Sequence, residues 1–479
     1  METSGKLIIG ARLKVLRKSL GLTQAQMAEQ VGVSSSYITL IESDQRPASA
    51  KLLVKLAQVY DLNISELAPE VDTQLTSDFS EALKDPVLDV GKITRSEIDA
   101  VLRASPKIAR ALVQLQSRNA QSWVSADVQP VDEETERAVA SGQLIRPSDQ
   151  VRAWLYEKKN YIDPLDRAAE ALSEELKLAR NEPNIALTER LAGHGLRIQI
   201  VSAKRMAGAL RRYDPLEKLL SLSELLGQPS RRFQMAIMIV HHEHDRRFKA
   251  LLEDMPFTDP EALSLARVTM ANYFAAALLM PYQRFFEACE TERYDLELLS
   301  HRFGTSFEQT AHRMSTLQRP EARGVPFFIV RVDRAGNVSK RFSAGRFPFS
   351  SFGGTCPLWN IHSAFETPGQ INTQIIRMPE GGRYFSIART INRVYGGHNA
   401  RPQRLVLGLG CDIAHAPRLI YSESLDLDAI KSTEIGLNCY LCERSNCPSR
   451  AQAPINRKLA VNELERSLAL YRFEGETTE

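Results

Sequence analysis

The segment from Gly21 to Pro47 limits the fold of this chain most, because it predicts two short helices joined by a tight turn. Thr23 is placed to cap the first helix, and Gln26, three residues later, completes a capping box. Gly32 follows the last apolar residue of that helix and suits a chain that turns sharply. The sequence therefore predicts a small all-α unit near the N-terminus.

The second predicted helix has one apolar and one polar face. Ser34 caps it, and Ile38 and Ile41 share the face that we expect to be buried. Small hydroxyl side chains occupy the opposite face, where they would let the helix lie deep in the major groove of DNA. The segment resembles the XRE (Cro/repressor-like) helix-turn-helix domain. From that resemblance we expect DNA contacts from Gln24, Ser34, Ser35, Ser36, Thr39 and Arg46.

Chain length, net charge and the length of the apolar runs limit the number of domains, the source of DNA affinity and the cellular location of the protein. A chain of 479 residues is too long for one core, so three or four domains are expected. The formal net charge is only +3, so DNA affinity must come from locally placed basic residues. The first residues lack the apolar core of a signal peptide, and the longest apolar runs are too short to span a bilayer. We therefore expect a cytoplasmic protein without a membrane partner.

The sequence pattern divides the chain into four parts, and the expected fold class is multidomain α+β. The parts are a helix-turn-helix domain at 1–68, a linker or helical arm at 69–150, a mostly helical middle domain at 151–320 and a β-rich C-terminal domain at 321–479. A flexible linker and a dimerisation helix are equally compatible with the polar second part. Because helix-turn-helix domains act in pairs on half-sites, we expect a homodimer or higher homo-oligomer.

The middle domain contains two long apolar helical patterns, RRFQMAIMIVH and MANYFAAALLMP. They resemble the core helices of the ImmA/IrrE-type zinc peptidases, which need H-E-x-x-H on one helix, with the histidines as zinc ligands and the glutamate as base. Here the first His and the Glu fall on Ile237 and Met238, the second His on His241, and the downstream acidic ligand on Met270. One ligand does not make a zinc site, so we expect an inactive zincin-like fold and no enzyme.

An inactive peptidase fold offers a cavity between helices, which suits a small-molecule ligand. An anionic ligand such as an acyl-CoA would need cationic side chains around it. The candidates are Arg205, Arg211, Arg212, Arg313 and Arg323.

After about residue 323 the pattern changes from helical to β. Two runs at 326–333 and 338–342 flank a turn and predict a hairpin, and shorter strands follow at 373–378, 384–388 and 404–409. Glycine and proline separate these strands. We expect an α+β or mostly β domain with many loops.

Three cysteines within this last domain form a second strong motif, C-x2-C-x4-C. Clustered thiolates hold an iron–sulfur cluster or a tetrahedral zinc ion, and the spacing leaves both open. Cys289 and Cys356 stand alone and are expected to be ordinary buried thiols. The expected metal ligands are Cys439, Cys442, Cys447 and Cys411, the last with Asp412 and His415 as alternatives.

The whole arrangement resembles the short-chain fatty acyl transcriptional regulators. The likeness extends through nearly the whole chain and includes the strings STLQRPEARGVPFFIVRVDRAGNVSKR, GLGCDIAHAPRLIYSESLDLD and CYLCERSNCPSRAQAP. It implies a bacterial regulator of propionate- and acetate-type metabolism that binds a double-stranded DNA operator and senses a short-chain acyl-CoA. It also implies a C-terminal iron–sulfur cluster of the 4Fe–4S type, with zinc as the alternative.

Two other functions stay open from the sequence. A redox-sensing transcription factor would use the cysteine cluster alone, without a small ligand. A regulatory metallopeptidase would cleave a partner protein, but the missing H-E-x-x-H motif argues against it.

Overall fold

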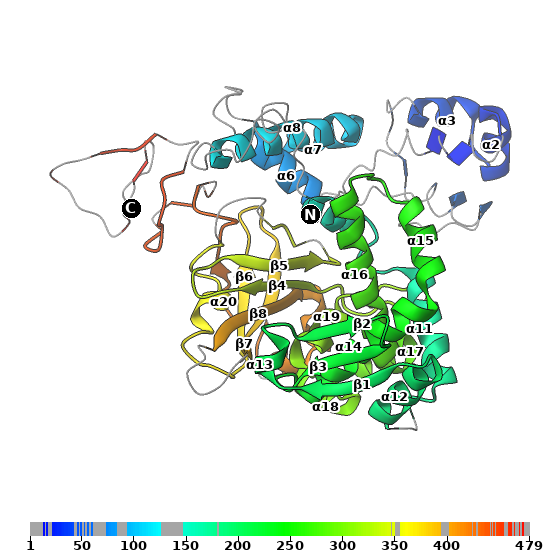
Figure 1. Ribbon diagram of the computed structural model, residues 1–479. Helices are drawn as coiled ribbons and strands as arrows, with labels where there is room; N and C mark the ends of the chain where they lie inside the picture. The colour runs from blue at the N-terminus through cyan, green and yellow to red at the C-terminus, as the bar shows by residue number, and fades with distance from the viewer. Residues whose placement is uncertain are drawn as a thin grey trace. The chain divides into compact units, whose positions relative to one another are not determined.

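The computed structural model of the chain consists of two compact units (Figure 1). The first comprises 1–79 and 90–111, and the second comprises 80–89 and 112–479. The residues described are 22–42, 73–83, 93–125, 147–179, 182–345, 347–349, 355–393 and 402–423, together with single positions and short stretches of 13–60 and 425–473.

The predicted helix-turn-helix is confirmed in the first unit. Its two helices are α2 (Gln24–Val31) and α3 (Ser35–Glu42). Gly32 ends α2 with a φ of 65°, in the left-handed region that glycine adopts without strain. Thr23 and Gln26 form the capping box through reciprocal hydrogen bonds. The small core that holds the helices together includes Leu13, Met27, Val31, Ile38, Ile41, Leu52 and Leu56.

Much of the following polar stretch is helical. The described part forms α6 (Thr73–Leu83), α7 (Arg95–Ala104) and α8 (Pro106–Ser125). Thr94 and Glu97 make a second capping box, which fixes the start of α7. The acidic segment 131–142, which the sequence left open as a tether or an arm, lies outside the described residues.

The middle of the chain is mostly helical, as predicted, and also contains a small sheet. Its elements are α10 (Pro147–Glu157), α11 (Asp163–Glu175), α12 (Pro183–Gly193), β1 (Arg197–Val201), α13 (Ala203–Met206), β2 (Arg211–Asp214), β3 (Leu219–Ser223), α14 (Gln228–Glu243), α15 (Asp245–Glu253), α16 (Pro260–Leu279), α17 (Tyr282–Thr291), α18 (Leu296–Phe303) and α19 (Phe307–Met314). The sheet order is β1–β3–β2, with β1 parallel and β2 antiparallel to β3.

Helix α16 is the central element of this part. Asp259 caps its N-terminus and Pro260 occupies its first turn, where a proline needs no hydrogen-bond partner. The helix is long and apolar enough to cross a membrane by length and composition, but 61% of its most apolar window is buried inside the protein. It packs against α10, α11 and α14, so we interpret it as the core helix of this domain.

The C-terminal part is built on a six-stranded sheet with the order β5–β4–β8–β7–β6–β9 (Figure 1). Its strands are β4 (Phe328–Val332), β5 (Val338–Ser343), β6 (Asn372–Arg377), β7 (Arg383–Arg393), β8 (Gln403–Asp412) and β9 (Thr433–Glu434), with the short helices α20 (Asn360–Ser363), η2 (Ile413–Arg418) and η3 (Ile420–Ser422). All pairings are antiparallel except that of β6 with β9. The predicted hairpin and the three later strands are confirmed.

The two faces of this sheet pack in two separate cores. On β8, the side chains of Leu407, Leu409 and Cys411 lie in the core that contains helices α17, α18 and α19, whereas Val406 lies in the core that contains α20. Position 410 requires a glycine, because a Cβ there would approach the Phe328 ring to 2.2 Å. Because successive side chains of a strand point to opposite faces of the sheet, the alternation places Cys411 in one core, and Cys356 lies in the other.

Candidate functional sites

The exposed face of α3 carries the expected DNA-contacting hydroxyls. Ser35, Ser36 and Thr39 are exposed, and on the opposite face Ile38 and Ile41 are fully buried. The hydroxyl of Thr39 donates to Gln24 at 3.2 Å, which links this face to the first turn of α2. The arrangement leaves small polar side chains on a helix whose backbone can approach a major groove closely.

One hydrogen bond and one ion pair join Glu42, at the end of α3, to neighbouring side chains. Gln24 donates to Glu42 at 2.7 Å, and Arg17 pairs with the same carboxylate at 2.6 and 2.9 Å. Burial opposes the ionisation of Glu42, but the hydrogen bonds from Arg17 and Gln24 outweigh it, so its pKa is lowered. Arg46 lies over the ring of Tyr37, with its guanidinium carbon 5.1 Å from the ring centroid, and remains exposed.

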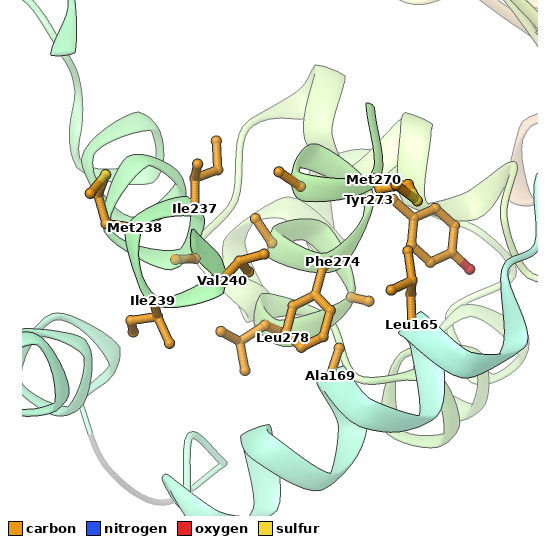
Figure 2. Close-up of a cluster of buried hydrophobic side chains, with 14 of the residues drawn as sticks. Leu165, Ala169, Ile237, Met238, Ile239, Val240, Met270, Tyr273, Phe274 and Leu278 are labelled. Carbon is orange, nitrogen blue, oxygen red and sulfur yellow. The ribbon is translucent and has the colours of Figure 1, made fainter. Parts of the chain in front are cut away.

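Two of the three zinc-ligand positions of a peptidase of this type, and the position of its catalytic glutamate, are apolar here. Ile237 and Met238 on α14 and Met270 on α16 are 6%, 3% and 0% exposed. Figure 2 shows these side chains within the cluster of aliphatic and aromatic groups that joins the two helices. His241 is half-buried, and burial followed by the charges of Arg211 and Arg267 lowers its pKa. Among the described residues, no three His, Cys, Asp or Glu side chains converge to hold a metal ion.

The other side chains of the histidine cluster have separate partners. Glu243 accepts hydrogen bonds from Arg190 at 2.7 and 2.9 Å and contacts His194 at 2.7 Å. His242 stacks on His194 with 5.9 Å between ring centroids, and His244 packs against a phenylalanine of α16. The cluster therefore forms the polar end of a helix and does not resemble a metal centre.

Arg313, one of the arginines expected from the sequence to bind a ligand, lies inside the domain core and already has partners there. It is fully buried and pairs with Asp166 through two hydrogen bonds of 2.8 Å, and the hydroxyl of Tyr273 donates to the same carboxylate at 2.6 Å. Its guanidinium also donates to the carbonyl of Met280 at 3.0 Å. These bonds connect α11, α16 and α19, so Arg313 stabilises the domain.

The other four expected arginines do not form one site with Arg313. Arg205 on α13 and Arg212 on β2 are exposed, and Arg323 is exposed before the C-terminal sheet. Arg211 is partly buried on β2, and burial lowers its pKa. None of the five expected arginines lines either of the two pockets found in the described part of the chain.

The structure revises the expected thiol cluster. Cys439, Cys442 and Cys447 follow β9, but Cys411 is buried on the opposite face of the sheet, in register with Phe385. Burial raises the pKa of the Cys411 thiol. The structure therefore does not bring Cys411 to the other three, and it places the alternative residue Asp412 as a cap on the amide of Ala414.

Cys356, which the sequence left as an isolated thiol, is the cysteine that faces the motif. Burial raises the pKa of its thiol, amide N–H groups of Gly436 and Leu358 donate to its sulfur, and Cys442 and Cys439 add to the shift as nearby thiols. A Cβ at Gly436 would lie 2.7 Å from the sulfur of Cys442, so this glycine lets the chain pass between the two cysteines. No local sequence signal identified Cys356, because its neighbours in space are far along the chain.

Three sequence families match successive parts of the chain. "Helix-turn-helix" matches 13–67, "IrrE N-terminal-like domain" matches 191–315, and "Short-chain fatty acyl coenzyme A regulator, C-terminal" matches 316–471. The matches follow the order of the helix-turn-helix unit, the α14–α16 core and the six-stranded sheet.

Relatives that match over nearly the whole chain are regulators as well. The HTH-type transcriptional regulator RamB of Mycobacterium tuberculosis is 39% identical over 97% of this chain and 98% of its own length. The propionyl-CoA carboxylase regulator of Cereibacter sphaeroides is 38% identical over 98% and 99%. A solved structure, a Mycobacterium tuberculosis transcriptional regulator, is 39% identical with a TM-score of 0.65, covering 68% of this chain and 99% of that one. The chain therefore belongs to the short-chain fatty acyl coenzyme A regulators, a family of DNA-binding transcriptional regulators with an N-terminal helix-turn-helix and an IrrE-like middle domain.

Proposed function

We propose that this cytoplasmic protein regulates genes of propionate- and acetate-type carbon metabolism by changing its operator affinity when it binds a short-chain acyl-CoA. One observation carries the proposal: the same chain contains an exposed polar face on α3 and a peptidase-like core with apolar side chains at two of its three zinc-ligand positions and at the position of the catalytic glutamate. Such a core can hold a ligand without hydrolysing a peptide. The name of the Cereibacter relative supports the choice of metabolism.

The test measures operator affinity with and without effector. A duplex selected from a random library by the full-length protein is titrated in fluorescence anisotropy, with saturating acetyl-, propionyl- or butyryl-CoA and with free CoA as the control. We expect at least one thioester to change the DNA Kd by roughly 5- to 150-fold, the usual range of allosteric coupling. Identical DNA affinity in all conditions would overturn the effector role, since a ligand shifts an equilibrium only by its differential affinity.

We propose further that the thiols hold a 4Fe–4S cluster, with zinc as the alternative occupant, and that Cys356 supplies the fourth ligand in place of Cys411. Two observations support Cys356 as the fourth ligand: the thiols of Cys439 and Cys442 are near enough to raise its pKa, and two backbone N–H groups donate to its sulfur. The described thiols do not converge on one point in the structure, so binding of the cluster would have to draw them together. Such hydrogen bonds stabilise a thiolate and tune a metal bound to it. When bound, the cluster would supply one-electron chemistry or join the loops after β9 to the segment around Cys356.

The choice of fourth ligand is tested with two single substitutions. Cys356→Ser and Cys411→Ser proteins are purified anaerobically, and iron, sulfide and zinc are measured per chain together with the visible absorbance. We expect Cys356→Ser to lose the cluster and Cys411→Ser to keep it, because the sulfur of Cys411 lies on the other face of the sheet. A cluster that survives in Cys356→Ser and disappears in Cys411→Ser would contradict this assignment.

We also propose that the protein acts as a homodimer or higher homo-oligomer and has no peptidase activity. Pairing of two helix-turn-helix units on half-sites supports the first statement, and the apolar residues at 237, 238 and 270 support the second. Light scattering coupled to size exclusion tests the assembly, and a monomer that binds DNA fully would contradict it. Chelator-sensitive cleavage of a partner protein would contradict the proposed absence of peptidase activity.

A further inference from the structure

Strand β1 lies at one edge of the middle-domain sheet and has a neighbouring strand, β3, on one side (Figure 1). The amide of Arg197 and the carbonyl of Val201 each make a 2.9 Å hydrogen bond to a residue that flanks β3. Because the backbone polar groups of successive strand residues point to opposite edges, those of Ile198 and Ile200 point away from β3. Each of these two isoleucines therefore presents an amide and a carbonyl that no strand of the described part of the chain binds.

The centre of β1 lacks the features that usually protect the edge of a sheet. Native sheets keep their edges apart with charged side chains or with very short edge strands. Edge strand β2 has the sequence RRYD, edge strand β5 carries Lys340 and Arg341, and edge strand β9 has two residues. The centre of β1 consists of Ile198, Gln199 and Ile200. Among the edge strands of the two described sheets, β1 is therefore the one with an uncharged centre of full strand length.

An apolar side chain of β1 is also left uncovered at this edge. Ile198 pairs with Leu220 of β3 and Ile200 with Leu222, so the four side chains lie on the face of the sheet that packs against the domain core. Leu220 and Leu222 are 0% and 2% exposed, whereas Ile200 is 57% exposed. A further strand beside β1 would cover Ile200 in the same way that β1 and the core cover Leu222.

From this arrangement we infer that β1 pairs with β1 of a second copy of the chain, antiparallel across a two-fold axis at Gln199. In this register Ile198 of each copy lies opposite Ile200 of the other. Both residues point their backbone groups to the open edge, so each pair exchanges two hydrogen bonds. The pairing satisfies all the outward amides and carbonyls of Ile198 and Ile200 in both copies and joins the two small sheets into one sheet of six strands.

The strand is complementary to itself in this register, as a two-fold contact requires. The two isoleucine pairs place branched apolar side chains opposite each other, which stabilises neighbouring strands. Arg197 lies opposite Val201, so the arginines of the two copies are not opposed, and the uncharged Gln199 side chains meet on the axis. This self-complementarity favours a second copy over an unrelated peptide as the partner of β1.

The inference rests on the proposed homo-oligomer and names the surface through which the middle domains associate. A contact through one short strand from each copy is small for a protein interface. We therefore expect an association that depends on protein concentration, and dilution is the way to measure it.

The first experiment compares the assembly of full-length wild type and Ile200→Lys by light scattering coupled to size exclusion over a dilution series. Val268→Lys on α16 is the matched control, because Val268 is 56% exposed and receives the same charge in the same domain. We expect Ile200→Lys to dissociate at a concentration higher than wild type by roughly tenfold or more, since each dimer would bury two ammonium groups beside isoleucines. The control should dissociate like wild type, and circular dichroism and Tm verify that both variants are folded.

The second experiment tests the register by disulfide formation under mild oxidation. Opposed residues at this position of an antiparallel pair have Cα atoms about 4.5 Å apart, within the range of a disulfide. Gln199→Cys should therefore form a covalent dimer, which mass spectrometry identifies by a peptide that joins two copies of position 199. Ser221→Cys is the control, because Ser221 pairs with Gln199 one strand farther from the axis. Two copies of that position would be roughly 14 Å apart and should not react, nor should wild type give this peptide.

Three results would contradict the inference. If wild type is an oligomer, Ile200→Lys assembles equally well and Gln199→Cys forms no covalent dimer, the homo-oligomer stands, the β1 contact fails and the edge is left to an extended peptide of another protein. Equal cross-linking of Gln199→Cys and Ser221→Cys would exclude the register across Gln199. A wild type that is monomeric at every concentration, without a cross-link at position 199, would overturn both the β1 contact and the proposed assembly.

Discussion

At the scale of single residues, the most consequential group is the buried pair of Asp166 and Arg313. Both side chains are 0% exposed, and Tyr273 completes the carboxylate's hydrogen bonds. A buried pair with satisfied hydrogen bonds contributes little relative to an apolar pair, but the loss of one partner leaves an isolated buried charge. The sequence could not reveal this role, because Asp166 and Arg313 are distant in the chain and each alone resembles a surface residue.

We predict that Asp166→Asn lowers the free energy of unfolding of the middle domain by about 3–5 kcal/mol, because Arg313 stays charged and buried. Urea denaturation followed by tryptophan fluorescence measures the change. Glu217→Gln is the control, since Glu217 and Arg197 are 69% and 70% exposed and such pairs contribute about 1 kcal/mol or less. If Asp166→Asn behaves like the control, the pair does not stabilise the domain as we infer.

A second residue-scale prediction concerns Lys340 on β5. Burial lowers its pKa to about 8, although Glu308 opposes the shift. Between this value and the ordinary lysine value near 10.5, the unfolded chain binds more protons than the folded one, so stability rises with pH across this window. We expect the stability difference between wild type and Lys340→Met to grow by about 1 kcal/mol in favour of wild type from pH 7.5 to 10, after allowance for partial exposure.

This prediction is measured as the difference between two stability curves, because tyrosines and thiols elsewhere also titrate in alkali. Guanidinium unfolding at half-unit pH steps gives both curves. A difference that stays flat across the window would show that Lys340 titrates normally in the folded protein.

At the scale of elements, local patterns predicted much of the architecture and failed where partners are distant. The capping box at Thr23 and the alternation of the strands after residue 326 are local signals, and both gave the correct elements. Strand β2 was missed because its sequence, RRYD, has no apolar alternation, and only pairing with β3 makes it a strand. Cys356 was missed for the same reason, since its neighbours come from the chain after β9.

A substitution on the exposed face of α3 can change operator affinity without changing the stability of the fold. We predict that Ser36→Glu leaves the Tm within about 2 °C, because a carboxylate in the first turn of a helix is favourable and surface changes are small. Operator affinity should fall at least tenfold, since the new charge faces the phosphates of the duplex. Anisotropy and differential scanning calorimetry measure the two effects.

The matched control is Ser96→Glu, which places the same charge at the second residue of α7, where Ser96 is also exposed. We expect this variant to bind the operator like wild type. Equal losses in both variants would mean that overall charge, and not the face of α3, determines the affinity.

At the scale of the whole molecule, the chain joins a DNA-binding unit to a unit whose middle domain lacks two of the three zinc ligands of its peptidase relatives. The order of the parts could be predicted from sequence, because each carries its own motif. The neighbours of Cys356 could not be predicted, since the thiols near it come from the chain after β9, which meets this cysteine only in the folded chain. A regulator of this kind works only if ligand and DNA are coupled through states that each binds differently.

That coupling gives the last prediction, because thermodynamic linkage makes it reciprocal. If propionyl-CoA changes the DNA Kd by a given factor, a saturating operator must change the Kd of propionyl-CoA by the same factor and in the same direction. Calorimetry measures the Kd of propionyl-CoA with and without bound operator. The ratio of these two values is then compared with the ratio of the DNA Kd values from anisotropy. Unequal factors beyond the error of measurement would show that the ligand acts by a route other than binding to the DNA-bound protein, such as a change of assembly state.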